Sequence, residues 1–353
     1  GAGGGSIAWV DEGGSLRVGP QSAGSEPGPA CYGRGGSEAT ITDANLVLGR
    51  LEPTLSGKFP LDAGAAETAI AAVGEQVGLG MLETAEAVIE ICCENMAQAI
   101  KLVLVDRGRD PRDFAIASFG GAGAMHASFI ARAMSIPKIV VPINAGVGSA
   151  FGAITMDLRH DLEDFYYGSV ADADFDRLNQ LYEGLETRGR ALLARDGIAA
   201  DEMALQRNAQ MRYIGQFWEV VTEIPPGNLS TDSVAAICSA FNNEHETEHG
   251  VASPQFAVEF VSIGLTATGR SKKRRRTIDQ ISGSGDLKIG ERQVFFDGKW
   301  HLTSVYSGNA LTEQDKIPGP AIIEYPHSVT VLPPQANATV DKLANLIIDT
   351  TQP

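Results

Sequence analysis

Apolar residues recur every three or four positions over long stretches of the chain, which is the spacing of an amphipathic helix. The clearest example is residues 84–107, where Val88, Ile91 and further apolar side chains follow this period. The pattern predicts a helix there that is largely buried. Further helices are expected at residues 63–77, 175–196 and 231–248.

A short apolar run near the middle of the chain leads through glycines into another helix. Residues 114–119 predict a strand, and the turn that begins at Gly120 opens a helix that reaches about Met134. Residues 138–142 predict a second strand. Because the two strands flank a helix, we expect a β-α-β unit with a parallel sheet.

The second half of the chain has a different character. A charged segment at residues 157–164 is followed by one helix, by strands at 206–213 and 219–224, by another helix, and then by short β runs over 256–348. A chain of 353 residues also exceeds the usual size of one hydrophobic core. We therefore expect two domains, an α/β domain over residues 1–158 and a mixed, β-rich α+β domain over 159–353.

A loop rich in glycine, proline and serine spans residues 19–36. It is too long for a simple connection, which favours a segment that covers a substrate, with Glu26 and Arg34 as contacts; an ordinary surface loop is the alternative. Its thiol, Cys31, is expected to be structural because no partner histidine can be inferred. A short helix at 40–50 follows.

Asp43 lies near the start of this short helix. With Thr42, it is one of the two candidates for the N-cap, which would satisfy free N–H groups of the first turn. The functional alternative makes Asp43 a catalytic, metal-binding or substrate-contacting carboxylate beside the glycine-rich loop.

The glycine-rich turn at residues 120–123 lacks side chains that would keep a phosphate or nucleotide away from its N–H groups. A tight turn without a ligand is the alternative. His126, which follows, is a candidate for phosphate contact or proton transfer, or else packs against a neighbouring helix. NAD is disfavoured because His126 takes the third glycine position, and the absence of Gly-Lys-Ser/Thr excludes a Walker A loop.

Charge and cysteine content narrow the function classes further. A net charge of −16 argues against nucleic acid, so the basic run at 271–276 is expected to be an exposed loop that pairs with acidic surface. His160 and its acidic neighbours favour a solvated face over a metal cluster.

Four cysteines without a C-x-x-C pair fit a reducing cytoplasm. Neither a membrane span nor a secretion signal is expected.

Several motifs together resemble the hydantoinase A, 5-oxoprolinase and acetone carboxylase β-subunit family. They are spread over the whole chain, at residues 1–11, 18–24, 27–36, 42–51, 119–123, 212–216 and 319–324. The resemblance implies part of an actin-like ATPase lobe, of the sugar kinase and Hsp70 type, followed by a C-terminal domain. It also implies that two Asp-Gly-Gly-Thr-like phosphate loops lie upstream of Gly1, so this chain holds only part of the active site.

The resemblance further implies a chemistry. Gly120, Gly121, Ala122 and Gly123 correspond to the motif on the adenosine side of ATP, with Mg²⁺ or Mn²⁺ as the metal and Asp43 as a possible ligand. The first expectation is that this chain is part of an ATP-dependent cyclic-amide hydrolase. Its partners would be the N-terminal half of the same enzyme and a hydantoinase B-like subunit. An ATP-dependent ketone carboxylase and a non-catalytic nucleotide-binding subunit remain alternatives. No acidic residue stands beside His327, where the family pattern leads us to expect one.

Overall fold

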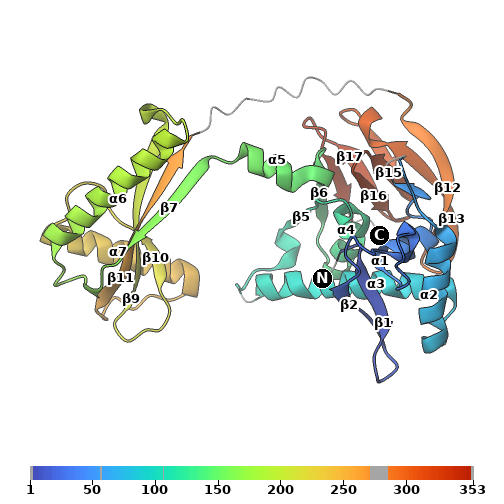
Figure 1. Ribbon diagram of the computed structural model, residues 1–353, viewed down its shortest axis with the longest axis horizontal. Coiled ribbons are helices and arrows are strands. Elements are labelled where there is room, and N and C mark those ends of the chain that lie inside the picture. The colour runs from blue at the N-terminus through green and yellow to red at the C-terminus, as the bar shows by residue number, and fades with distance from the viewer. Residues whose placement is uncertain (1–2, 56–57, 106, 271–284, 351–353) are drawn as a thin grey trace. The chain divides into compact units, whose positions relative to one another are not determined.

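The computed structural model describes residues 3–55, 58–105, 107–270 and 285–350 (Figure 1). The chain forms two compact units, Gly1–Ala153 together with Arg276–Pro353, and Ile154–Arg275. The sequence predicts one crossing between domains, near residue 158, whereas in the structure the chain returns to the first unit. The predicted basic loop at 271–276 lies outside the described residues.

The return of the chain follows from strand pairing. The last strand, β18 (Leu346–Asp349), pairs antiparallel with β6 (Lys138–Val141), with Ile348 opposite Ile139. Both isoleucines are fully buried. Local apolar patterns along residues 256–348 cannot reveal this partner, because it lies about 200 residues away in sequence.

The first unit begins with a hairpin and three helices. The expected helix at 63–77 is confirmed: Asp62 caps its N-terminus and left-handed Gly78 ends it. A second short strand pair lies between the first two helices. The elements are β1 (Ser6–Val10), β2 (Leu16–Ser22), α1 (Ile41–Val47), β3 (Thr54–Leu55), β4 (Phe59–Pro60), α2 (Ala63–Val77) and α3 (Met81–Val105).

The longest helix, α3, is buried only along part of its length. Val88 and Ile89 lie in the core, as predicted, but Leu102 and Val103 near the C-terminal end are 64% and 59% exposed. The helix begins three residues earlier and ends two residues earlier than the periodicity predicts. None of the described helices is both long and apolar enough to cross a membrane.

The predicted β-α-β unit is confirmed, within a sheet that is mixed rather than parallel. Strand β5 (Ala115–Ala117) pairs parallel with β6, and α4 (Gly123–Met134) connects them. Beyond β6 the sheet continues antiparallel through β18, β17 (Asn337–Val340) and β14 (Lys316–Pro318). Thus β5 forms one edge of the five-stranded sheet.

A second sheet of the first unit contains four strands and packs against α4. Their order is β12-β13-β15-β16, and Ser128 of α4 donates to the carbonyl oxygen of Val331 on β16 at 3.3 Å. Helix α4 therefore contacts both this sheet and α3. The strands are β12 (Lys288–Phe296), β13 (Lys299–Ser307), β15 (Ala321–Tyr325) and β16 (Ser328–Leu332).

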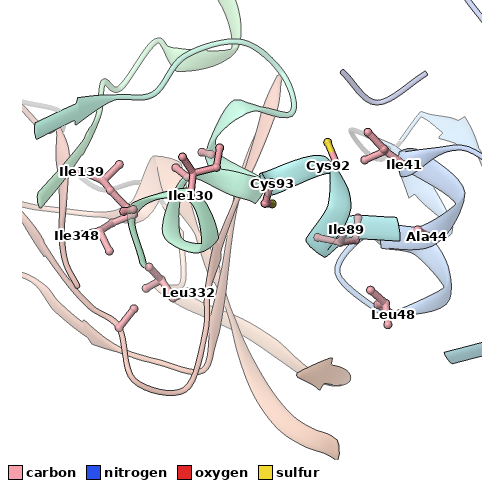
Figure 2. Close-up of a cluster of buried hydrophobic side chains, with 14 of the residues drawn as sticks. Ile41, Ala44, Leu48, Ile89, Cys92, Cys93, Ile130, Ile139, Leu332 and Ile348 are labelled. Atoms are coloured by element: carbon pink, nitrogen blue, oxygen red, sulfur yellow. The ribbon is translucent and has the colours of Figure 1, made fainter. Parts of the chain in front are cut away.

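The core of the first unit joins segments from both ends of the chain. Figure 2 shows apolar side chains running from α1 through α3 and α4 to the two sheets. Removing each leucine or isoleucine side chain of this core from water contributes roughly 1.5–3 kcal/mol. The labelled residues are Ile41, Ala44, Leu48, Ile89, Cys92, Cys93, Ile130, Ile139, Leu332 and Ile348.

The second unit is an antiparallel sheet with two long helices. Its main strand order is β10-β9-β11-β7, with β8 paired to β11, and Tyr182 and Phe241 bring α6 and α7 into its core. The mixed α and β content matches the expectation. The elements are β7 (Leu158–Asp164), β8 (Gly168–Ser169), α6 (Phe175–Arg195), β9 (Met203–Tyr213), β10 (Val220–Glu223), α7 (Val234–His249) and β11 (Val258–Gly269). The remaining helix, α5 (Gly148–Thr155), begins in the first unit.

The junction between α1 and β12 depends on Gly49. Its φ is +72°, and a Cβ there would lie 2.3 Å from the carbonyl oxygen of Gln293. Gly49→Ala is expected to lower the free energy of unfolding by about 2–4 kcal/mol, measured by chemical denaturation. Gly14→Ala, which also has positive φ but no atom within 4 Å, should cost only about 1 kcal/mol. Equal effects of the two variants would contradict the packing argument.

Candidate functional site

A cavity of about 630 Å³ lies in the first unit. It gathers several segments that the sequence analysis singled out: the N-terminal glycines, the long loop, the glycine-rich turn and the segment around Glu324. Lining residues include Gly4, Gly5, Gly24, Pro29, Tyr32, Thr42, Glu52, Gly121, Ala122, Met125, Glu324, Tyr325 and His327. This convergence of distant loops makes the cavity the candidate site.

The glycine-rich turn presents backbone to this cavity. Gly120 has φ +93°, and its N–H donates to the carbonyl oxygen of Ala145 at 2.7 Å, which anchors the turn to the second glycine-rich loop, residues 144–152. Ala122 caps α4 without a side-chain hydrogen bond. The first N–H groups of a helix lack intrahelical acceptors and carry partial positive charge, so this end of α4 suits an anionic group.

The segment that contains His327 forms another side of the cavity. It packs so closely on the second glycine-rich loop that a Cβ at Gly146 would lie 2.4 Å from the carbonyl oxygen of His327. At Gly121 the same oxygen would be 3.6 Å away, an ordinary contact, and no other atom outside the turn lies within 4 Å. Gly146 is therefore needed for packing, whereas Gly121 leaves open space.

Asp43 is buried and its carboxylate is occupied by internal hydrogen bonds. Its two oxygens accept from the backbone N–H groups of Ala30, Cys31 and Thr40 at 3.2, 2.8 and 2.9 Å, and from the Thr40 hydroxyl at 2.7 Å. Thr40, not Thr42 or Asp43, is the N-cap, because its hydroxyl and the Asp43 carboxylate form a reciprocal capping box. Asp43 fastens the long loop to α1 and does not line the cavity.

The long loop contributes an aromatic ring to the cavity rather than its charged residues. Tyr32 lines the cavity, while Glu26 is exposed and, like Arg34, is not among the lining residues. Arg34 donates to the carbonyl oxygen of Ser25 at 3.2 Å, and its guanidinium lies 5.1 Å from the Phe59 ring centroid. The Arg34 side chain therefore braces the loop from outside.

His126 points into the core beside Arg50 and Cys93. It is 3% exposed, its Nδ1 is 3.9 Å from the Cys93 sulfur, and its Nε2 has no partner among the described residues. Burial, aided by the Arg50 charge, lowers the pKa of His126 to about 4. The imidazole is therefore neutral and packs against helices, which is the alternative that the sequence analysis left open.

Two glutamates and an arginine at the cavity were missed by the sequence analysis. Arg292 Nη1 lies 2.7 Å from Glu324 Oε1 and 3.2 Å from Glu52 Oε1, and Arg292 Nε donates to the carbonyl oxygen of Gly49. Both carboxylates line the cavity. Glu324 ends one of the recognised motifs, but no local pattern connects Glu52 with Arg292.

The remaining polar candidates do not form a metal centre. Cys31 is fully buried, and burial and the Asp43 carboxylate raise its thiol pKa, as expected for a structural cysteine. His160 Nε2 lies 2.6 Å from Asp196 Oδ2 on the second unit. Among the described residues, no group of three or more His, Cys, Asp or Glu side chains is arranged to hold a metal ion.

The motif at residues 212–216 organises a turn of the second unit. Tyr213 donates from its hydroxyl to Asn242 Oδ1 at 2.5 Å, and Gln216 Nε2 lies 3.0 Å from His245 Nε2. His245 Nδ1 is 2.6 Å from the carbonyl oxygen of Val251, so this nitrogen carries the proton. The motif thus connects the β9–β10 turn to α7.

Comparison with known proteins assigns both parts of the chain. The Hydantoinase/oxoprolinase family matches residues 1–162, and the Hydantoinase/oxoprolinase C-terminal domain matches residues 169–348. Caprolactamase subunit alpha of Pseudomonas jessenii is 34% identical over 98% of this chain and 51% of its own length. Acetophenone carboxylase gamma subunit of Aromatoleum aromaticum is 32% identical over all of this chain and 50% of its own.

A solved structure shows that the fold is shared. The ATP-dependent caprolactamase of Pseudomonas jessenii superposes with a TM-score of 0.79 at 32% identity, over 99% of this chain and 52% of that one. The expected mixed α/β fold of the hydantoinase group is confirmed. The chain spans about half the length of the curated relatives that it matches.

Removal of the Asp43 carboxylate should loosen the long loop. Asp43→Ala leaves three buried N–H groups without their acceptor, so we expect a loss on the order of 4 kcal/mol in the free energy of unfolding. Asp62→Ala, which removes an exposed cap of α2, should cost about 1 kcal/mol. Urea denaturation of both variants checks this; a small effect at Asp43 would refute its fastening role.

Burial of neutral His126 should make stability depend on pH. Its folded pKa, about 4, lies below the unfolded value near 6.5, so the unfolded chain binds the proton first as pH falls. Neutral His126 therefore contributes about 3 kcal/mol to the free energy of unfolding. This contribution is complete above pH 6.5 and is lost as the pH falls toward 4. Denaturation of His126→Leu at pH 7, 5.5 and 4.5 should show a shallower decline than the unmodified protein; parallel curves would contradict the assignment.

Proposed function

Because the chain belongs to the hydantoinase/oxoprolinase family, we propose that it supplies part of an ATP-dependent enzyme that hydrolyses cyclic amides. The observation that carries this proposal is the 630 Å³ cavity in which the glycine-rich turn, the N-terminal glycines and the long loop meet. Caprolactamase, an ATP-dependent relative, supports the lactam branch. The relatives' subunit names support assembly with other chains.

The nucleotide side of the cavity is the N-terminal end of α4. Gly121 and Ala122 line it, and their small size lets an adenosine or phosphate group approach the backbone. Gly4 and Gly5 also line the cavity, but they are closely packed, because a Cβ would lie 2.7 Å from Thr42 Oγ1 at Gly4 and 2.9 Å from Ser22 Oγ at Gly5. Thr42 fixes this backbone by donating to the carbonyl oxygen of Gly4 at 2.9 Å. These residues fit a nucleotide.

The described residues do not by themselves fit a divalent metal. Asp43, the carboxylate expected to hold it, is buried and fully hydrogen-bonded. Glu52 and Glu324 face the cavity, but both pair with the single guanidinium of Arg292, and among the described residues no group of three or more His, Cys, Asp or Glu side chains is arranged to hold a metal ion. No step of the proposed function is therefore assigned to a metal held by this chain.

When bound, ATP would supply phosphorylation of the amide oxygen, which turns a stable lactam into a species that water can open. This chain would contribute positioning. Tyr32 and His327 border the cavity beside the glutamates and offer hydrogen bonds to a polar substrate. Arg292 holds the two carboxylates in place, so the electrostatic environment is set before the substrate arrives.

We further propose that the N-terminal half of the enzyme completes the cleft next to β5. This edge strand is flanked by Phe114 and Phe119, which are 40% and 57% exposed, although strands of parallel pairs are normally covered on both faces. The relatives are about twice as long as this chain, which supports such a segment. A hydantoinase B-like subunit is the proposed second partner.

The ketone carboxylase alternative is supported by the acetophenone carboxylase relative. Phosphate release by the complete assembly, measured with ATP and Mg²⁺, distinguishes cyclic-amide hydrolysis from ketone carboxylation. Stimulation by caprolactam, 5-oxoproline or a hydantoin supports hydrolysis, whereas bicarbonate-dependent stimulation by a ketone replaces it with carboxylation. If none of these compounds stimulates phosphate release, while a partner chain alone hydrolyses ATP, a non-catalytic role for this chain would be favoured.

Gly121→Val tests the nucleotide side directly. The position has no positive φ and open space around it, so the variant should fold while its side chain blocks approach to the turn. In the complete enzyme we expect at least a tenfold loss of ATP affinity, measured by calorimetry. Gly290→Val, on exposed β12 with no atom within 4 Å, is the matched control and should bind normally. Unchanged affinity in Gly121→Val would overturn the assignment.

A further inference from the structure

A second cavity, of about 230 Å³, lies between α3 and α4 of the first unit. Its walls carry opposite charges. Glu86, Glu90 and Glu94 follow one another at four-residue intervals on one face of α3, and Arg132 stands on α4. Arg50 adds a second cation on the side of α1. A cavity polarised in this way suits a ligand that carries both charges.

Arg50 is the feature that the fold alone does not explain. It is 2% exposed, and its guanidinium lies 4.7 and 5.3 Å from the ring centroids of Phe129 and Phe296. Its Nε and Nη1 atoms have no hydrogen-bond partner among the described residues, and Nη2 reaches only the carbonyl oxygen of Phe295, at 3.5 Å. Buried donors are nearly always paired, so an acceptor belongs beside Arg50.

The charge of Arg50 decides which acceptor fits best. Burial lowers its pKa to about 10, which still leaves the guanidinium protonated at neutral pH. Carboxylates form the strongest hydrogen bonds with such a cation. Asp297 is in the lining but lies 3.7 Å from Arg132, with which it forms an ion pair. Glu86 and Glu90 attract the charge of Arg50 but, among the described residues, no carboxylate hydrogen-bonds to its guanidinium. The carboxylate for Arg50 is therefore expected to come from a ligand.

We propose that this cavity is a second ligand site, which takes a small zwitterion with its carboxylate on Arg50 and its ammonium group among Glu86, Glu90 and Glu94. In the choice of zwitterion the inference rests on the proposed function, because hydrolysis of a lactam such as caprolactam or 5-oxoproline turns the ring amide into one carboxylate and one ammonium group on the same molecule. The ring-opened product thus has the chemistry of the cavity. The site takes product separately from the nucleotide cleft.

The position of the cavity gives this site a structural link to the cleft. Helix α4 borders both cavities, with Met125 lining the first and Phe129 and Arg132 lining the second. Arg50 is likewise two residues from Glu52 of the first cavity. A bound zwitterion would therefore contact the helix whose first turn faces the proposed nucleotide.

Calorimetry on the complete enzyme, without ATP or lactam, tests the proposal. The probes are 6-aminohexanoate and L-glutamate, the products of opening caprolactam and 5-oxoproline. Hexanoate and hexylamine are controls that carry one charge each. We expect at least one zwitterion to bind tenfold or more tightly than either control. Binding of hexanoate as tightly as the zwitterions, or no zwitterion binding, would overturn the proposal; in the latter case a buried water satisfies Arg50.

Two variants locate the binding. Glu90→Gln removes an exposed carboxylate of the cavity and should weaken zwitterion binding about fivefold to tenfold, whereas Glu75→Gln on α2, outside the cavity, should leave it unchanged. Arg50→Gln should abolish binding, and circular dichroism shows whether that variant folds. Equal affinity in Glu90→Gln and Glu75→Gln would place the ligand elsewhere and overturn the proposal. Since no turnover is measured, failure of the proposed hydrolysis would not affect this result.

Discussion

The pairing of β18 with β6 is the constraint on which the first unit depends. It brings the end of the chain back to the sheet that carries the glycine-rich turn, and it buries Ile139 and Ile348 together. Without this pairing β6 would lose its partner on one side, and α4 would lose part of the layer beneath it. The turn at Gly120 is therefore held by residues that lie more than 200 positions further along the chain.

The same return of the chain builds the candidate site. The second sheet and its β15–β16 turn present Glu324 and His327 to the cavity, which the long loop and the glycine-rich turn also line. Asp43 holds the long loop in place by accepting three backbone N–H groups. The polar residues around the cavity thus divide into those that build its walls, such as Asp43 and Arg292, and those that face a ligand, such as Tyr32.

Helix α4 combines these roles in one element. Its N-terminal turn faces the larger cavity and also carries His126, which is buried and neutral in the core, while its later turns border the smaller cavity beside Arg50. Burying two polar side chains, one of them charged, is costly unless they find partners. The unpaired nitrogens of Arg50 and His126 are therefore an energetic cost within the core of the first unit.

The sequence by itself determined what depends on local pattern: the helices at residues 63–77 and 175–195, the β-α-β unit, the glycine-rich turn and the family, whose motifs are ordered along the chain. Tertiary structure decided what depends on distant partners. Asp43 carries a residue type common to helix caps and active sites, and only the tertiary structure shows that its carboxylate accepts the N–H groups of Ala30 and Cys31 and so fastens the long loop to α1. The cluster of Arg292 with Glu52 and Glu324, and the return of β18, join segments far apart in sequence. Hydrophobic periodicity reports which face of a segment is buried, but not which segment covers it.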